Sequence, residues 1–153
     1  MNIIEMKNVS IAYGENIIVE NLKLEIPKGK ITTIIGPNGC GKSTTLKTMG
    51  RLLSQKNGEV LINGENLKNF KTVEIAKKMA ILPQTPKAPH GLLVEELISY
   101  GRYPHKDKFK SISKKDKEII DWAIENTKLE KVRKTEIGSL SGGQRQRVWI
   151  AMA

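Results

Sequence analysis

Apolar residues in the first half of the chain alternate with polar ones or run together in short stretches, as β-strands require. Leu22, Leu24 and Ile26 alternate with polar neighbours, which is typical of a strand with one buried face. The β-branched run 31–35 has the composition of a strand buried on both faces. Strands are therefore predicted over residues 2–9, 16–26, 31–35, 59–62 and 79–82, with a tight turn at Asn63-Gly64.

Helical spacing predominates in the other segments. Leu46, Met49 and Leu53 recur at helical spacing after a glycine-rich loop. Ser113 and Ser141 each precede an acid or amide side chain by three residues, which is the capping-box pattern of a helix start. The predicted helices begin near Lys42, Ser113 and Ser141 and cover 72–78 and 94–100, with a proline-containing loop at 84–91.

The composition narrows the class of protein. The single cysteine excludes an internal disulfide framework and a cysteine-only zinc site, and the two histidines lack metal-ligand spacing. No apolar run approaches the length of about 18 residues that a membrane span needs, and the first residues lack the basic-then-apolar pattern of a signal peptide. These features, over 153 residues, predict a cytosolic globular domain.

Basic residues outnumber acidic ones. The chain has 26 Lys and Arg against 16 Asp and Glu, a net charge of +10, and residues 101–117 alone hold seven basic against two acidic side chains. Contact with nucleic acid or anionic lipid is one interpretation of this basic stretch, and a solvated loop and helix face is the other. Because aromatic residues make up only 5% of the chain, a base-stacking platform is disfavoured, and no direct nucleic acid partner is expected.

Residues 36–44, the phosphate loop, carry the chemistry of phosphate binding. Gly36-x-x-x-x-Gly41-Lys42-Ser43 matches the phosphate-loop pattern between a predicted strand and a predicted helix. A polyphosphate needs several backbone N–H groups directed at it, and glycines permit that close approach. Lys42 is expected to reach the β- and γ-phosphates of ATP, and the Ser43 hydroxyl to coordinate Mg²⁺. The whole predicted cradle consists of Gly36, Pro37, Asn38, Gly39, Cys40, Gly41, Lys42, Ser43 and Thr44.

Cys40 lies inside the phosphate loop. Its side chain is either merely small enough to fit there or, facing bound nucleotide beside Lys42, a reactive thiol. The sequence leaves both interpretations open.

A second motif distinguishes this chain among the many ATPases and GTPases that have phosphate loops. Residues 140–144, the signature segment, read Leu-Ser-Gly-Gly-Gln, and Gln84 stands between the two motifs. On these motifs the chain resembles the ATP-binding subunit of ABC transporters, and all 153 residues follow the order of that family's N-terminal portion. The backbone freedom of Gly142 and Gly143, at a helix start that faces an anion, agrees with this resemblance.

The resemblance assigns roles to individual residues. Tyr13 is expected to stack on adenine, and Gln84 to contact Mg²⁺ and the attacking water. The signature segment would act in trans, on the γ-phosphate held by a second subunit, so the resemblance implies a homodimer that encloses each ATP between its subunits. The catalytic set that it implies is Lys42, Gln84, Ser141, Gly142, Gly143 and Gln144.

Residues 90–105 further resemble the iron-siderophore and cobalamin importer branch of this family. In that branch the segment after the glutamine contacts the membrane subunits. The resemblance therefore implies permease subunits as partners and a peripheral location on the cytoplasmic side of the cell membrane. A generic importer is the alternative.

The resemblance implies an α/β fold with a P-loop NTPase core, a parallel sheet, an N-terminal antiparallel β portion and an inserted helical subdomain. We predict the nucleotide-binding core over 1–83, the helical subdomain with the glutamine loop over 84–138, and the signature motif with its helix over 139–153.

The family continues into an apolar strand that ends in Asp-Glu, and then to a switch histidine, neither of which is found among these 153 residues. We therefore expect a chain truncated before that strand, with ATPase activity in the full-length dimer and negligible hydrolysis by these residues alone. The alternatives are a nucleotide-binding module without catalysis and a soluble non-transport ABC ATPase.

Overall fold

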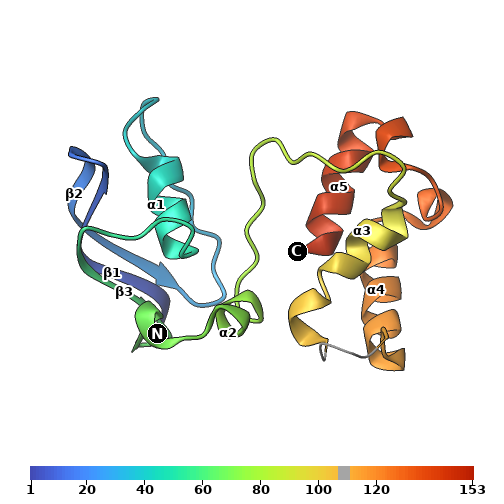
Figure 1. Cartoon of the computed structure of the whole chain (residues 1–153), viewed down its shortest axis with the longest axis horizontal. Helices are drawn as coiled ribbons and strands as arrows, with labels where there is room; N and C mark the ends of the chain where they lie inside the picture. The colour runs from blue at the N-terminus through green and yellow to red at the C-terminus, as the bar shows by residue number, and fades with distance from the viewer. Residues whose placement is uncertain (107–110) are drawn as a thin grey trace. The chain divides into compact units, whose positions relative to one another are not determined.

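The computed structural model describes residues 1–106 and 111–153, and the chain folds as two units (Figure 1). The first unit is Met1–Ile75 and the second is Ala76–Ala153. Each has its own buried side chains and is described by itself. The predicted boundaries after residues 83 and 138, between the nucleotide-binding core, the helical subdomain and the signature part, stay predictions.

A four-stranded antiparallel sheet builds the first unit, in the order β2-β1-β3-β4. Its strands are β1 (Asn2–Tyr13), β2 (Asn16–Pro27), β3 (Asn57–Ile62) and β4 (Glu65–Asn66). β1 pairs along both edges, so that Met6 lies opposite Leu24 of β2 and opposite Val60 of β3. Asn63 and Gly64 have φ values of 50° and 83°, and these left-handed values confirm the predicted tight turn.

The helices of the first unit follow the phosphate loop and the sheet. They are α1 (Lys42–Met49), the 3-10 turn η1 (Leu67–Asn69) and α2 (Thr72–Ala76). α1 contacts β1 and β2 and buries three threonines and Met49, while Met6, Val9 and Ile11 of β1 are buried in the same unit. α1 begins at Lys42, as predicted, but ends before Leu53 because Gly50 closes its last turn.

Two predicted strands, 31–35 and 79–82, are wrong. Neither segment belongs to the sheet, and within residues 1–106 and 111–153 no strand pairs with either of them. Ile31 and Ile35 are 99% and 85% exposed, whereas the prediction places them in a doubly buried strand. Extended backbone becomes a strand only through hydrogen bonds to a neighbour, and β-branched composition does not provide one. The α/β class and the antiparallel N-terminal portion are confirmed, but the described strands form no parallel sheet.

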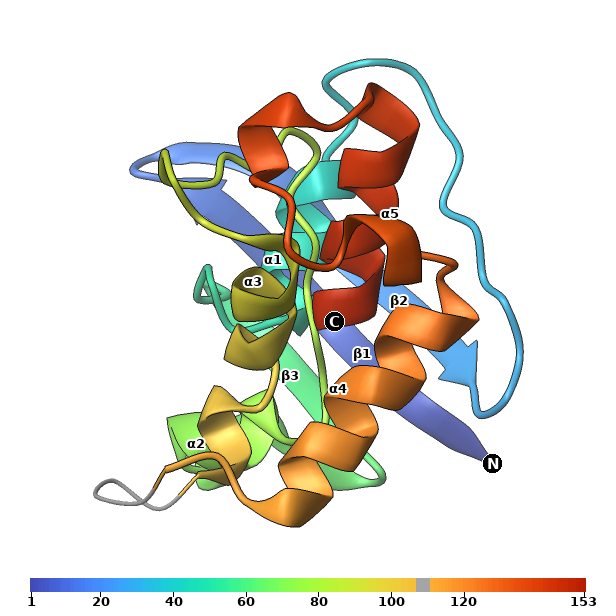
Figure 2. The ribbon, with the colours of Figure 1, turned by 90° about the vertical axis from the view of Figure 1, so that its right-hand side faces the viewer.

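The second unit is helical. Its helices are α3 (Val94–Tyr100), α4 (Lys114–Asn126) and α5 (Gly142–Met152), with 3-10 turns η2 (Tyr103–His105), η3 (Glu130–Val132) and η4 (Ile137–Ser139). Figure 2 shows α3, α4 and α5 side by side, and all three contact one another. Their shared core consists of Val94, Leu97, Ile98, Ile120, Ala123, Ile124, Leu129, Ile137, Leu140 and Val148.

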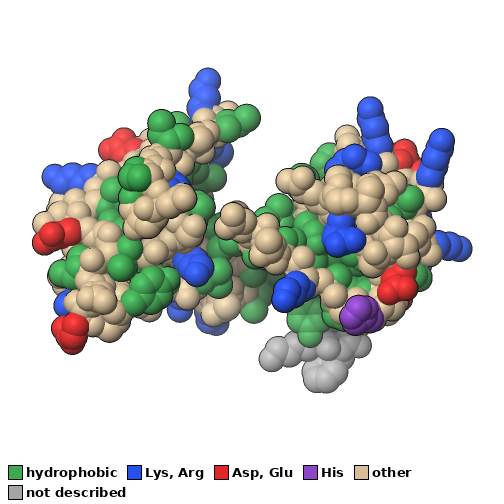
Figure 3. Space-filling model, turned by 90° about the horizontal axis from the view of Figure 1, so that it is seen from above, with side chains coloured by type: hydrophobic (Ala, Val, Ile, Leu, Met, Phe, Trp, Pro, Cys, Tyr) green, Lys and Arg blue, Asp and Glu red, His purple; other side chains and the backbone are tan. Residues whose placement is uncertain are grey.

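Local sequence patterns predict these helices correctly. The range 94–100 matches α3, and both predicted capping boxes form, with Ser113 Oγ accepting from Asp116 N at 3.1 Å and Ser141 Oγ accepting from Gln144 N at 3.3 Å. Across the described residues, the structure contains no helix long and apolar enough to cross a membrane. Lysine and arginine side chains project from both units (Figure 3).

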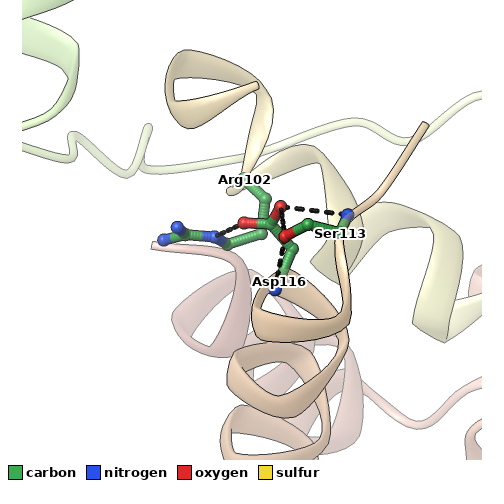
Figure 4. A network of polar contacts seen from close by, with 3 residues as sticks. All are labelled: Arg102, Ser113 and Asp116. Carbon is green, nitrogen blue, oxygen red and sulfur yellow. Dashed lines mark hydrogen bonds and ion pairs between the residues drawn. The ribbon is translucent and has the colours of Figure 1, made fainter. Parts of the chain in front are cut away.

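A polar network fixes the start of α4 (Figure 4). Asp116 Oδ2 accepts from Ser113 N at 3.2 Å and from Ser113 Oγ at 2.6 Å, and Asp116 Oδ1 accepts from Arg102 Nε at 2.9 Å. The hydrogen bond from Ser113, with the Arg102 guanidinium beside it, lowers the pKa of the Asp116 carboxyl to about 2. Two charges of the basic stretch 101–117 thus neutralise each other, while residues 107–110 of that stretch lie outside the described residues.

We expect Asp116→Asn to lower the Tm of the full chain by several degrees at pH 7, because an amide cannot replace the ionised acceptor of Ser113 and Arg102. Since the pKa is 3.8 without these contacts and about 2 with them, the carboxylate stabilises the fold fully above its unfolded pKa. That stabilisation is lost as the pH falls toward 2. Thermal scans between pH 7 and pH 2 should show the Tm difference shrinking.

Glu118→Gln is the matched control for this variant. Glu118 is exposed on the same helix, so its substitution removes the same charge without removing a buried contact. We expect its Tm to follow the wild type throughout. Equal losses in the two variants, or a loss in Asp116→Asn that ignores pH, would contradict the assignment.

Candidate nucleotide-binding site

Glycine is favoured at three positions of the phosphate loop, for reasons that differ from one position to the next. Gly39 and Gly41 have φ values of 83° and 91°, in the left-handed region that side chains with a Cβ rarely adopt. At Gly39 a Cβ would meet open space, whereas at Gly41 it would lie 2.5 Å from Val19 Cγ2. At Gly36 a Cβ would lie 2.8 Å from Cys40 Sγ, so the thiol fills the space that this glycine leaves.

The Lys42 side chain folds back over the loop that precedes it. Its Nζ donates to Gly36 O at 2.8 Å and to Pro37 O at 2.6 Å, and lies 3.8 Å from Cys40 Sγ. Within the described residues, no carboxylate forms an ion pair with this ammonium group. The loop therefore presents a positive charge held by neutral carbonyl groups, which suits an incoming anion.

The N-terminus of α1 adds to this positive end. Its N-cap residue is Gly41, so no side chain caps the N–H groups of the first turn, and the helix dipole places partial positive charge there. Ser43 is exposed, while Thr44 is buried. Uncapped N–H groups and a nearby ammonium form the arrangement that binds phosphate at helix starts.

The signature segment begins α5 in the second unit. Ser141 and Gln144 are engaged with the helix itself, since Gln144 Oε1 accepts from Ser141 N at 3.0 Å while Ser141 Oγ accepts from Gln144 N. Apart from its chain neighbours and the backbone of α5 itself, a Cβ on Gly142 or Gly143 would meet no atom within 4 Å. Arg145 Nη2 donates to Leu140 O at 3.1 Å, which is a structural role. The two glycines therefore leave a bare backbone surface that no part of the second unit fills.

Two other predicted site residues are exposed. Tyr13 ends β1 in the first unit and is 48% exposed, so its ring is available for stacking. Gln84 is exposed in the loop of the second unit. The structure thus gathers Gly36, Pro37, Cys40 and Lys42 into one cluster and Ser141 with Gln144 into another, in separate units.

Sequence reasoning missed one residue of the site, Val19. It lies on β2 and contacts the position of Gly41, and Ile18 Cγ2 would lie 3.5 Å from a Cβ there. These two residues support the loop from a strand more than twenty positions earlier. Apolar residues in a half-buried strand carry no signal that marks such a contact.

Comparison with known families identifies the group of ATPases to which this chain belongs. The family model described as ABC transporter matches residues 19–153. The chain belongs to the ABC transporter family. This ABC chain is 55% identical over 153 residues to the iron(3+)-hydroxamate import ATP-binding protein FhuC of Bacillus subtilis. It is 48% identical over 152 residues to the probable siderophore transport system ATP-binding protein YusV of the same organism.

These matches cover nearly all of the ABC chain but only part of each relative. They include 100% and 99% of this chain, and the chain spans 57% and 55% of the length of the two curated relatives. A solved structure of an ATP-binding cassette of an ABC transporter superposes with a TM-score of 0.85 at 27% identity, over 100% of this chain and 64% of that one. The ABC ATPase fold that the two motifs imply is therefore confirmed, except for the parallel sheet, which the described strands do not form.

We expect Gly41→Ala to destabilise the ABC chain more than Gly39→Ala. Both variants force alanine into the left-handed region, at about 1–2 kcal/mol. Only Gly41→Ala also drives a Cβ into Val19, and overpacking of that kind costs about 1–3 kcal/mol more. Urea unfolding of the two variants measures the difference in the free energy of unfolding.

The double variant Gly41→Ala with Val19→Ala is the control for this contact. Removing Cγ2 of Val19 gives the new Cβ room, so the two substitutions together should cost less than the sum of their separate effects. Strict additivity, or equal destabilisation by Gly39→Ala and Gly41→Ala, would show that Val19 does not confine the loop.

Proposed function

We propose that this protein is the ATP-binding and ATP-hydrolysing subunit of an ABC-type importer, and that the imported solute is an iron–siderophore complex. The observation that carries the nucleotide part is the position of the Lys42 ammonium, held 2.6–2.8 Å from two carbonyls of the phosphate loop beside an uncapped helix start. The hydrolysis, the partners and the solute are proposed from family membership and from the relatives' names.

The phosphate loop fits ATP with Mg²⁺ by its donor set. Lys42 Nζ would exchange carbonyl oxygens for β- and γ-phosphate oxygens, and the N–H groups at the start of α1 would donate to the phosphates. The exposed hydroxyl of Ser43 and the side-chain oxygen of Gln84 are the proposed oxygen ligands of Mg²⁺, which would neutralise charge on the phosphates. Tyr13 would stack on adenine, and Gln84 would hold the attacking water.

The signature segment would complete the site from a second subunit. Glycine in the first turns of a helix costs up to about 1 kcal/mol relative to alanine, and nothing in the second unit requires it at 142 or 143. The bare backbone there supports contact with a group from outside the subunit, the γ-phosphate bound by the partner. Two copies of this chain would then enclose two ATP molecules, with Ser141 and Gln144 holding the start of α5 in place.

Permease subunits and a peripheral position on the cytoplasmic side of the membrane belong to the same proposal. FhuC is named for iron(3+)-hydroxamate import and YusV for siderophore transport. Their similarity to this chain extends over residues 90–105, the segment proposed to contact the permease. Closing of the dimer around ATP would act on the permease through this segment, and hydrolysis would release it.

We expect Lys42→Ala to weaken MgATP binding at least about 100-fold, because it removes charge-assisted hydrogen bonds to two phosphates. Lys47→Ala is the matched control: it removes the same charge from the exposed last turn of α1 and should bind MgATP within about twofold of the wild type. Isothermal titration calorimetry measures both. Unchanged affinity in Lys42→Ala would remove the phosphate loop from the nucleotide site.

We expect Ser141→Arg to block ATP-driven dimerisation of the full-length protein while leaving MgATP affinity within about twofold. The long cation would occupy the surface that the partner's γ-phosphate is proposed to contact. Ser139→Arg, on the exposed end of η4, adds the same side chain two residues earlier and should dimerise normally. Light scattering with and without MgATP measures the dimer, and dimers formed by Ser141→Arg would disprove the action in trans.

A further inference from the structure

Two segments far apart in sequence run side by side in the second unit, just before α3 and just before the signature segment. Leu93 and Glu136 form an isolated antiparallel bridge. Ile137 N donates to Leu92 O at 3.0 Å, and Val94 N donates to Thr135 O at 3.1 Å. The backbone entering α3 is therefore hydrogen-bonded to the backbone that leads to Ser141.

One side chain reinforces this pairing. Glu136 Oε1 accepts from Gly91 N at 2.8 Å, across 45 residues of sequence. Gly91 has a φ of 78°, a left-handed value that favours glycine, and it is the last residue of the predicted loop that begins at Gln84. We call residues 84–91 the glutamine loop. The Glu136 carboxylate thus holds the end of the glutamine loop to the residues that precede the signature segment.

The chain between Glu136 and Ser141 has little freedom. Residues 137–139 form η4, and Ile137 and Leu140 are buried in the helical core at 1% and 6% exposure. Arg145 reaches back from α5 to donate to Leu140 O at 3.1 Å. If Glu136 is displaced, the start of α5 therefore moves with it, because the residues between Glu136 and α5 have little freedom to adjust.

The same segment is also anchored to two helices. Arg133 Nε donates to Glu95 of α3, and its Nη1 donates to Asp121 of α4, both at 2.6 Å. Arg133 and Glu136 are three residues apart, so the segment that they belong to is fixed against α3, α4 and the glutamine loop together. Of these contacts, only the one from Glu136 reaches the loop.

We propose that Glu136 is a positioning residue that couples the glutamine loop to the signature segment within one subunit. This role of Glu136 rests on the proposed function in one respect, namely that Gln84 and Ser141 act on nucleotide. A change in the loop would move the Gly91 N–H, and the Glu136 carboxylate would transmit that movement to the start of α5. The coupling is a matter of position, since Glu136 touches neither nucleotide nor water in this scheme.

Amide hydrogen exchange of the full chain tests the coupling directly. In Glu136→Ala we expect exchange about tenfold faster at Gly91, Gln144 and Arg145, since a hydrogen bond to a charged group is lost. Glu136→Gln keeps an oxygen acceptor and should restore exchange to within about twofold of the wild type. Glu130→Ala removes the same charge from the exposed start of η3 and should change nothing.

The pattern of exchange separates coupling from a general loss of stability. The amides of α4 should exchange as in the wild type in every variant, because α4 is held to this segment by Arg133, which every variant keeps. Faster exchange at Gly91 with Gln144 and Arg145 unchanged would overturn the coupling, as would equally faster exchange in α4. An effect of Glu130→Ala equal to that of Glu136→Ala would do the same.

Dimerisation of the full-length protein gives the functional readout. Glu136→Ala should weaken ATP-driven dimerisation about tenfold with MgATP affinity unchanged, and Glu136→Gln should recover most of it. Normal dimerisation by Glu136→Ala would overturn the proposal. If the wild type itself does not dimerise with ATP, the proposed function fails, while the exchange pattern still decides whether Glu136 couples the two segments.

Discussion

Backbone pairing of β1 on both of its edges is the constraint on which the nucleotide site depends. β1 pairs with β2 and with β3, and it contacts α1. β2, held in this way, places Val19 against the backbone of Gly41. The start of α1, and with it the uncapped N–H groups and the Lys42 ammonium, is therefore set by a sheet that contains no phosphate-loop residue.

Features set by neighbouring residues were predicted well from the sequence, and features set by distant ones were not. The capping pairs Ser113–Asp116 and Ser141–Gln144 are three residues apart, so their spacing alone determines the contact. Arg102 joins Asp116 from fourteen positions away, and nothing in the local pattern indicates it. The wrong strands have the same cause, because β-branched composition reports a local preference whereas a strand requires a distant partner.

The glycines of the phosphate loop and those of the signature segment differ in why they are needed, and this difference is visible only in the structure. Gly41 is needed inside its own unit, where Val19 leaves no room for a side chain. Gly142 and Gly143 are not, because open space surrounds them. The first kind of glycine shapes a loop from within, and the second leaves backbone accessible to another molecule. In the sequence the two kinds of glycine cannot be told apart, because each simply occupies a glycine position of its motif pattern.

The exposed segment 31–35 has a consequence for the behaviour of these 153 residues studied alone, which span 57% of the length of the FhuC relative. It is an extended, β-branched and uncharged run whose two apolar ends, Ile31 and Ile35, are 99% and 85% exposed. Unpaired backbone of this composition is a template for intermolecular strands. Because it leads directly into Gly36, self-association there would sequester the phosphate loop as well. In these 153 residues alone, self-association and nucleotide affinity are thus linked through residues 31–35.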